Sequence, residues 1–346
     1  MSELAASPSA ATDIGAAGNA KLVNGDWVPP EPLEPAWAAF FYWPPRPKAL
    51  LQFFFGWNGY LWPRPILYFG LAWLSWIYLT PEPSVVRELS FSWIWPIWVR
   101  NVAMVAAVAG FWHFVLYEVK TQGTQYKYNK RWPGGHYPSF FLHSQLLDNL
   151  FYTFVWAMPI FTAWEIFGIW MQANGCSPTV SWEERPIYLT GLLLLIPVFH
   201  LINFHLTHRL IHWGPLYRWV HSVHHRNVNP GPWSALSMHP VEAFLTFASA
   251  APYLVLPSNE LVITAALLFN YAAATPAHLG FGRVVVGPLG WLTDATDNYY
   301  HYLHHRYHEC NYSGSVFDKW FGTWHDGTVQ AHERMRARIR ERNLVR

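Results

Sequence analysis

The chain contains long stretches that lack Asp, Glu, Lys and Arg, separated by short charged segments. A membrane-spanning helix needs about 20 consecutive, mostly apolar residues. Six stretches approach this length: 65–81, 101–117, 149–171 with a single interruption at Glu165, 186–208, 243–259 and 261–282. The pattern predicts an all-α integral membrane helical bundle, with about four spanning helices followed by a hydrophobic hairpin made of the last two stretches.

The hairpin has two interpretations. Its charge-poor composition favours a segment that spans the membrane or re-enters it, with a turn at 257–260. Ala251, Pro252 and Pro276 weaken both halves as spanning helices, because proline removes a backbone donor from the helix. The alternative is a hairpin buried inside the protein, as in a soluble domain.

The charges in the loops predict how the bundle is oriented. Lys120, Lys127 and Lys130 lie in one loop, whereas the next loop carries two acidic residues and one Arg at 183–185. Cytoplasmic loops of membrane proteins carry the excess of Lys and Arg. We therefore expect both termini, the Lys120 loop and the region 208–239 on the cytoplasmic face of a multi-pass protein, in a bacterial inner membrane or in the endoplasmic reticulum.

The composition supports a membrane protein over a soluble one. Only 13% of the residues are charged, against about 25% in a typical soluble domain. A net charge of +2 does not indicate a nucleic-acid partner. Cys176 and Cys310 form no CxxC pattern, so neither a disulfide framework nor a thiolate metal site is expected. The oligomeric state is left open by the sequence.

The composition also divides the chain into regions. Residues 1–48 are rich in Ala, Ser, Pro and Gly, and we expect a disordered or interfacial arm there. Residues 49–196 form the predicted transmembrane region, and 197–326 carry most of the histidines. The basic tail 327–346 fits a helix close to an anionic membrane surface.

Three groups of histidines have the spacing of metal ligands. They read HRLIH, HSVHH and HYLHH, and they contain His208, His212, His221, His224, His225, His301, His304 and His305. Residues three and four apart project from the same side of a helix. Each group can therefore direct two or three imidazoles at one point, at the predicted cytoplasmic ends of the spans.

The number of imidazoles predicts two metal ions. Eight clustered ligands are too many for a single zinc of a hydrolase, which needs three protein ligands and an open position. The chain has no HExxH motif, and it lacks the ExxH pairs of soluble di-iron bundles. Imidazole suits iron, copper and zinc alike. A di-zinc membrane hydrolase and a His-rich metal transporter are the alternatives to a redox enzyme at this point.

The three boxes and the segments after them resemble the fatty acid hydroxylase and sterol desaturase superfamily of integral membrane enzymes. The second box continues as HHRNVNPGPWSALSMHPVE, and the third as HHRYHECNY followed by FDKWFGT. The resemblance covers roughly 197–326, which it identifies as a catalytic domain. It implies a histidine-bound di-metal centre, with iron as the expected metal, although zinc can occupy such a site in purified protein.

The resemblance adds further residues to the expected site. His239, in an HPxE-like element, and His278, which precedes Leu279 where the family often has Ser, are expected as ligands. Glu242, beside His239, and Asp297, four residues before His301, are candidates to hold an imidazole N–H in place, as metal-bound histidines require. Asn311, in the segment after the third box, is expected close to the ligands. No catalytic residue beyond the ligands is expected.

The implied reaction is the O2-dependent hydroxylation or desaturation of an unactivated C–H position in a lipid, such as a sterol or a fatty acyl chain. Sequence does not separate these two outcomes. The chain shows no flavin, NAD or haem motif, so the resemblance implies an external electron donor, either a ferredoxin or a cytochrome b5 with its reductase.

Overall fold

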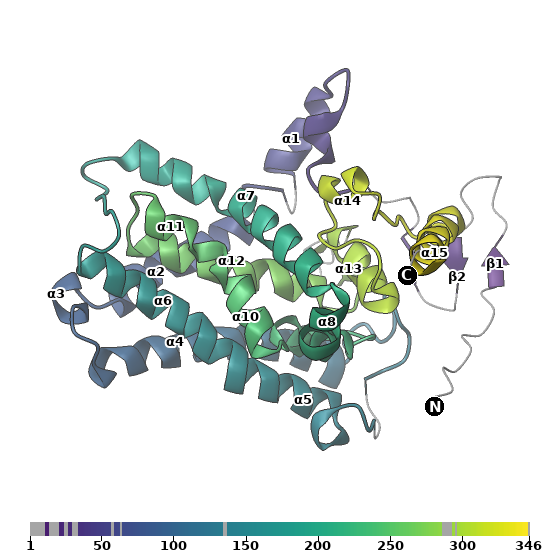
Figure 1. The fold of residues 1–346 in the computed structure, drawn as a ribbon, viewed down its shortest axis with the longest axis horizontal. Helices are drawn as coiled ribbons and strands as arrows, with labels where there is room; N and C mark the ends of the chain where they lie inside the picture. The colour runs from purple at the N-terminus through teal and green to yellow at the C-terminus, as the bar shows by residue number, and fades with distance from the viewer. Residues whose placement is uncertain are drawn as a thin grey trace.

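The structure, a computed structural model, describes residues 11–13, 21–23, 27–29, 34–56, 59–62, 64–133, 137–285, 293–294 and 296–344. Much of the predicted N-terminal arm 1–48 therefore lies outside the described residues. The strands are short: β1 (Ala11–Asp13) pairs antiparallel with β2 (Lys21–Val23), and β3 (Arg283–Val284) with β4 (Thr293–Asp294). The rest of the described architecture is helical, as the sequence predicts (Figure 1).

Long apolar helices form one end of the molecule. They are α2 (Arg64–Leu79), α4 (Phe91–His113) with a π-helical extension to Glu118, α5 (Gln145–Phe151) joined to α6 (Met158–Ala173) through a π-helical segment, α7 (Pro186–Ile211) and α12 (Glu260–Ala277). The shorter helices are α1 (Pro47–Phe55), α3 (Pro83–Val86), α8 (Gly214–Leu216), α9 (Ser222–His225), α10 (Pro240–Phe247), α11 (Pro252–Val255), α13 (Thr296–Tyr307), α14 (Val316–Trp320) and α15 (Val329–Leu344).

Four helices in the described part of the chain are long and apolar enough to cross a membrane: Phe91–Glu118, Gln145–Ala173, Pro186–Ile211 and Glu260–Ala277. The number agrees with the prediction, but the membership differs. Helix α2, expected to span, has only 16 residues, whereas α12, expected as half of a hairpin, reaches spanning length. The distinction matters because a helix of 16 residues rises only about 24 Å.

The first half of the predicted hairpin is not one helix. Stretch 243–259 is divided between α10, a 3-10 turn at Ala248–Ala250 and α11, which begins at Pro252. Proline cannot donate the backbone hydrogen bond that would continue α10, so the chain turns here. The result is a compact bend packed against α12 instead of a second spanning segment.

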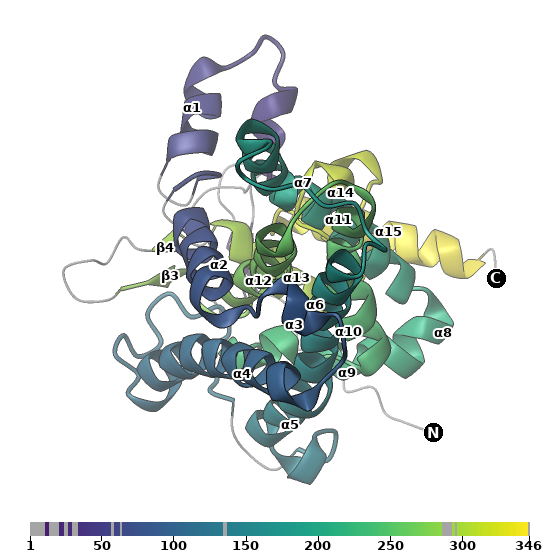
Figure 2. The ribbon, with the colours of Figure 1, turned by 90° about the vertical axis from the view of Figure 1, so that its left-hand side faces the viewer.

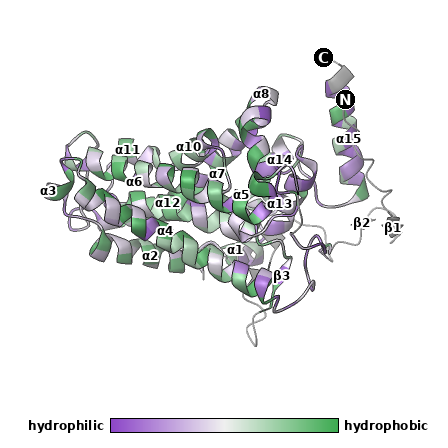
Figure 3. Ribbon diagram, turned by 90° about the horizontal axis from the view of Figure 1, so that it is seen from below, coloured by the Kyte–Doolittle hydropathy of each residue, from purple (hydrophilic) through white to green (hydrophobic). Residues whose placement is uncertain are grey.

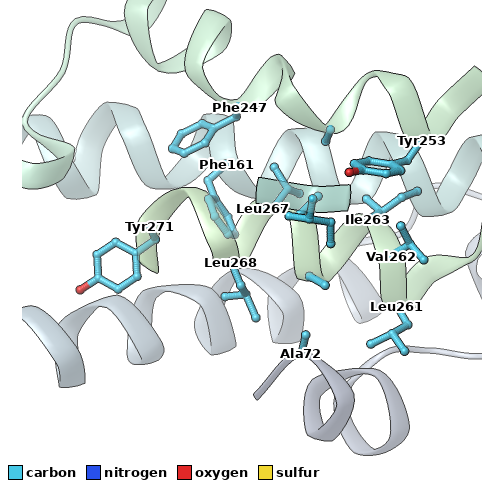
Figure 4. Packing of buried hydrophobic residues seen from close by; sticks show 14 of the residues in the cluster. Ala72, Phe161, Phe247, Tyr253, Leu261, Val262, Ile263, Leu267, Leu268 and Tyr271 are labelled. Carbon is cyan, nitrogen blue, oxygen red and sulfur yellow. The ribbon is translucent and has the colours of Figure 1, made fainter. Parts of the chain in front are cut away.

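Helix α12 is the central element of the bundle. In the most apolar 18 residues of α12, 72% are buried inside the protein, whereas in the corresponding part of α7 only 17% are buried. Helix α12 packs against α2, α6 and α7, and Figure 4 shows Leu267 and Leu268 among Phe161, Phe247 and Tyr271. Helix α12 is therefore apolar over most of its surface because most of that surface contacts protein.

A buried ion pair crosses the apolar bundle where the sequence suggested only an interruption. Arg100 of α4 lies 2.5 Å from Glu165 of α6, and both side chains are almost fully buried. Asn101 and Thr264 also donate to the Glu165 carboxylate, each at 2.8 Å. The pair therefore ties α4, α6 and α12 together. The predicted apolar stretches end at charged residues, so Arg100 lies just outside the stretch 101–117 although it belongs to α4.

The polar end of the molecule contains the C-terminal elements. Figure 3 shows the hydrophilic residues concentrated around α13, α14 and α15, with hydrophobic residues along the bundle. Figure 2 shows α1 projecting beside α7 and α2. Although α1 contains no buried residue, the chain around it packs onto the body: Ala36 donates to Gly314 O, and Val316 donates to Ala36 O. This contact brings the segment around Ala36 next to the histidine-rich region.

Candidate metal centre

Four segments bring the predicted ligands together at the junction of the two ends. His208 and His212 lie on the last turn of α7 and directly after it, and the second box lies on a π-helical turn (Tyr217–His221) followed by α9. The third box lies on α13, and His278 directly follows α12. Helical spacing turns the imidazoles of each box toward one point, and the packing of α7, α12 and α13 makes these points coincide.

The imidazoles form two groups that can each hold a metal ion. One group contains His208, His212, His221, His225 and His304, and the other contains His224, His278, His301 and His305. Within each group, one ligand atom per residue lies within 4.8 Å of all the others. Nine of the ten expected ligands therefore converge, and they divide into two neighbouring sites.

The distances between nitrogens fit a shared ion. His278 Nε2 lies 3.2 Å from His224 Nε2, 2.9 Å from His301 Nε2 and 3.2 Å from His305 Nε2. In the other group, His208 Nε2 lies 2.9 Å from His221 Nε2. Two nitrogens bound to one ion at about 2.1 Å are about 3.0 Å apart at a right angle and about 3.4 Å apart at the tetrahedral angle. The observed spacing is that of neighbouring ligands around one ion.

The outward-facing nitrogens fix the tautomer of several ligands. Because a carbonyl oxygen can only accept, each Nδ1 that contacts one must carry the proton and leave the Nε2 lone pair for a metal. The contacts are His208 Nδ1 to Tyr312 O at 2.5 Å, His224 Nδ1 to Ser237 O at 3.2 Å, His278 Nδ1 to Ala274 O at 2.7 Å and His304 Nδ1 to Cys310 O at 2.6 Å. The protein thus presents these imidazoles in the form that a metal requires.

Burial also keeps the ligands unprotonated. It lowers the pKa of His224 to about 4 and that of His278 to about 3. The pKa values of His225, His301 and His305 lie well below the usual range, because of burial first and neighbouring imidazoles second. Neutral imidazole is the ligand form, so no proton has to leave these groups at neutral pH before an ion binds.

The expected carboxylate and amide partners have different positions. Glu242 is buried, and its Oε1 lies 2.8 Å from Nδ1 of His221; burial raises the pKa of Glu242 well above its usual value. Asp297 belongs to α13, but its side chain lies outside the described part of the chain. Asn311 is buried, donates to His325 O at 2.9 Å and accepts from His325 N at 2.8 Å, so it fixes the loop after α13.

His239 lies outside both groups. It precedes α10, and its Nδ1 accepts from Val241 N at 3.2 Å, in the manner of a helix N-cap. Two further histidines outside both groups have polar partners: His205 contacts Ser313 Oγ at 3.0 Å, and His308 contacts Tyr217 Oη at 2.9 Å.

Asp318 supports the site in a way that the sequence analysis missed. Its buried carboxylate accepts from Tyr312 N and Ser313 N, both at 2.9 Å, and from Thr323 Oγ1 at 2.6 Å. It thereby holds the peptide whose carbonyl contacts His208. The signal was present as an acidic residue in the segment FDKWFGT, but sequence alone does not reveal which backbone groups fold around it.

Two cavities reach the histidines from different sides. The larger, about 680 Å³, is lined by five of the nine grouped imidazoles and by apolar residues of α7 and α12. Residues between Glu34 and Phe53, together with Gly59 and Tyr60, form part of its wall. The smaller, about 360 Å³, is lined by His212 together with Arg209, Arg338 and Arg342. The apolar cavity fits a lipid, whereas the smaller one is basic and polar.

The histidine-rich region matches a known protein family. Residues 192–323 match the family model for fatty acid hydroxylase. A Delta(7)-sterol 5(6)-desaturase of Gibberella zeae is 30% identical over 40% of this chain and 41% of its own length. Sphinganine C4-monooxygenase 1 of Arabidopsis thaliana is 29% identical over 36% of this chain and 51% of its own length. Methylsterol monooxygenase 1 of Gallus gallus is 26% identical over 41% of this chain and 50% of its own length.

The matches leave part of each protein uncovered, since the chain spans about half the length, or less, of these relatives. No solved structure matches the chain. The family model nevertheless covers all three histidine boxes and His278. Residues 192–323 therefore match the fatty acid hydroxylase family, and the sterol desaturase and monooxygenase relatives support placing this part of the chain in the fatty acid hydroxylase and sterol desaturase superfamily.

Proposed function

We propose that the protein is a membrane-bound, O2-dependent di-iron oxidoreductase that hydroxylates or desaturates an unactivated C–H position of a lipid. The observation that carries the proposal is the larger cavity, because one continuous space joins an apolar wall to five of the clustered imidazoles. The names of the relatives, which describe sterol desaturases and sterol or sphinganine monooxygenases, support the reaction class.

The donor set fits a pair of iron ions. His208, His212, His221, His225 and His304 would hold one, and His224, His278, His301 and His305 the other. Bound iron supplies the activation of O2, with two electrons from an external donor. Ferredoxin or cytochrome b5 with its reductase remain the candidate donors, and the basic cavity beside His212 offers an approach for an acidic protein.

The chain's own residues would position the lipid and exclude water. Phe204, Phe247 and Phe269 form part of the cavity wall, and such apolar surfaces align a chain without reacting with it. Trp37 and Phe53, whose ring centroids are 5.2 Å apart, cover the cavity from the N-terminal side. Glu242 Oε1 lies 2.8 Å from Nδ1 of His221, where it would help to orient that imidazole. We place the site on the cytoplasmic face, following the loop charges.

Lipid analysis tests this proposal. Lipids from cells that express the wild-type protein are compared by mass with those from cells expressing His224→Ala, and His113→Gln serves as the control outside the site. Wild type and control should produce a lipid with one oxygen atom more or two hydrogen atoms fewer, and His224→Ala should not. Release of a fatty acid by ester cleavage would instead support the di-zinc hydrolase, and metal accumulation without any lipid change would support the transporter.

A further inference from the structure

The wall of the larger cavity, which is more apolar than polar, contains a hydrogen-bonded polar pair outside the two groups of imidazoles. His200 of α7 and Asn270 of α12 both line it, and His200 Nδ1 lies 2.9 Å from Asn270 Oδ1. His200 is flanked by aromatic rings: Phe204 stacks on it at 5.8 Å between ring centroids, and Phe269 meets it edge-on at 5.3 Å. The rings hold the imidazole in place at the cavity surface.

The hydrogen bonds of Asn270 determine which nitrogen of His200 carries the proton. Asn270 Nδ2 donates to Ala266 O at 2.9 Å and to Ser249 Oγ at 2.6 Å. Because Ala266 O can only accept, the amide orientation is fixed and Oδ1 faces His200 as an acceptor. His200 Nδ1 must therefore donate. In a neutral imidazole, Nε2 is then an acceptor.

The acceptor nitrogen of His200 is available to a ligand. Within the described part of the chain, Nε2 of His200 has no hydrogen-bond partner. It is also not one of the fully buried atoms that lack a partner, so it is exposed at the cavity surface. Among the described imidazoles of the cavity wall, those that belong to the two groups direct their Nε2 atoms at one another, so these nitrogens are not available to a ligand in the same way. An acceptor in an apolar cavity selects a ligand that can donate a hydrogen bond.

We propose that His200, oriented by Asn270, receives a hydrogen-bond donor of the lipid, an alcohol O–H or an amide N–H, and so sets which carbon lies at the metal site. The inference rests on the proposed function, whose substrate class it narrows. His200 and His208 are eight residues apart on α7, which corresponds to about 12 Å along the helix. Phe204 bridges them, since its ring centroid lies 4.8 Å from that of His208. The donor group and the oxidised carbon are therefore separated by about two helical turns.

This geometry discriminates between lipid head groups. A carboxylate has only acceptor oxygens, which would face the acceptor nitrogen of His200 without a proton between them. A methyl ether likewise has no proton to donate. A fatty alcohol or an N-alkyl amide supplies the missing proton, and a single neutral hydrogen bond changes affinity by about 2- to 10-fold.

Two matched substitutions separate the hydrogen bond from packing. His200→Gln places a side-chain amide oxygen near the position of Nε2, whereas His200→Asn reaches only the position of Nδ1. His200→Phe keeps the ring and removes both nitrogens. Binding of hexadecan-1-ol, its methyl ether and hexadecanoate to the purified, metal-loaded full chain is measured for each protein, together with its metal content and the position of oxidation in the alcohol.

The wild type should bind hexadecan-1-ol about 2- to 10-fold more tightly than the ether, and more tightly than hexadecanoate. His200→Gln should keep this preference, while His200→Asn and His200→Phe should lose it and yield a mixture of oxidation positions, all with unchanged metal content. Equal binding of alcohol and ether by the wild type, or an unchanged preference in His200→Phe, would overturn the inference. If the wild type binds the alcohol selectively but oxidises no lipid, the proposed function fails and the binding site stands.

Discussion

At the residue scale, the site depends on backbone carbonyls as much as on imidazoles. Tyr312 O and Cys310 O, from the loop after α13, accept from His208 and His304. Asp318 and Asn311 hold this same loop through backbone hydrogen bonds. The ligands of different boxes are thus fixed by one short segment, so a change in that segment should disturb the metal site without touching a ligand.

The lowered pKa values predict how the metal-free protein responds to acid. His224 and His278, with pKa values of about 4 and 3 in the folded protein, would titrate near 6.5 once unfolded. Well above pH 6.5 these two histidines are neutral in both states and contribute no pH dependence. As pH falls from 6.5 toward 4, the unfolded chain takes up protons that the folded one does not, so stability decreases.

Thermal unfolding in detergent after chelation checks this expectation. The midpoint should be constant between pH 8 and pH 7 and should fall steadily below about pH 6.5. Loading with metal should raise the midpoint most at high pH, because protons compete with the ion for the same nitrogens. A metal-free protein that is as stable at pH 5 as at pH 8 would mean that these imidazoles are not buried in the neutral form.

At the element scale, the packing of α12 at the centre of the bundle constrains its neighbours. Gly168 of α6 lies against Ile263 of α12, so a Cβ atom there would lie 2.9 Å from Ile263 Cδ1 and 3.0 Å from Cγ2. At Gly191 of α7, a Cβ atom would meet nothing within 4 Å. The two glycines therefore have different roles although both are helical: only the first allows two helices to approach.

Valine at these two positions should have opposite consequences. Gly168→Val should destabilise the protein by about 1–3 kcal/mol, because the packed interface cannot admit the side chain without shifting. Gly191→Val should leave the unfolding midpoint nearly unchanged or raise it, since glycine is itself unfavourable within a helix. Thermal unfolding of both variants in the same detergent is the measurement. Equal loss at both positions would contradict the close packing of α6 on α12.

At the scale of the whole molecule, the helical membrane bundle and the histidines that converge could be predicted from the sequence. The way in which these histidines divide into two groups could not. The spacing within each box follows from helix geometry, so the eight histidines of the boxes could be named as candidate ligands from local pattern. Their division into two groups depends on how α7, α9, α12 and α13 cross, which no local pattern contains. For the same reason, the Arg100–Glu165 pair was missed, and α12 was expected as half of a hairpin.

The loop charges predict the orientation of the protein, with the histidines and both termini on the cytoplasmic side. The structure adds that the polar elements α13, α14 and α15 gather at the histidine end of the bundle (Figure 3). That clustering is consistent with a single water-facing end. The larger cavity is lined both by grouped imidazoles and by apolar residues of the long helices α7 and α12, as the proposed lipid substrate requires.

Metal content per chain tests the central claim most directly. His304 belongs to the first group of imidazoles and His224 to the second. Purified wild-type protein should contain about two metal ions per chain, and the double variant His224→Ala with His304→Ala should contain close to none. His239→Gln, outside both groups, should retain two. Full occupancy in the double variant, or a wild type that holds no more than one ion when metal is in excess, would contradict the two-site arrangement.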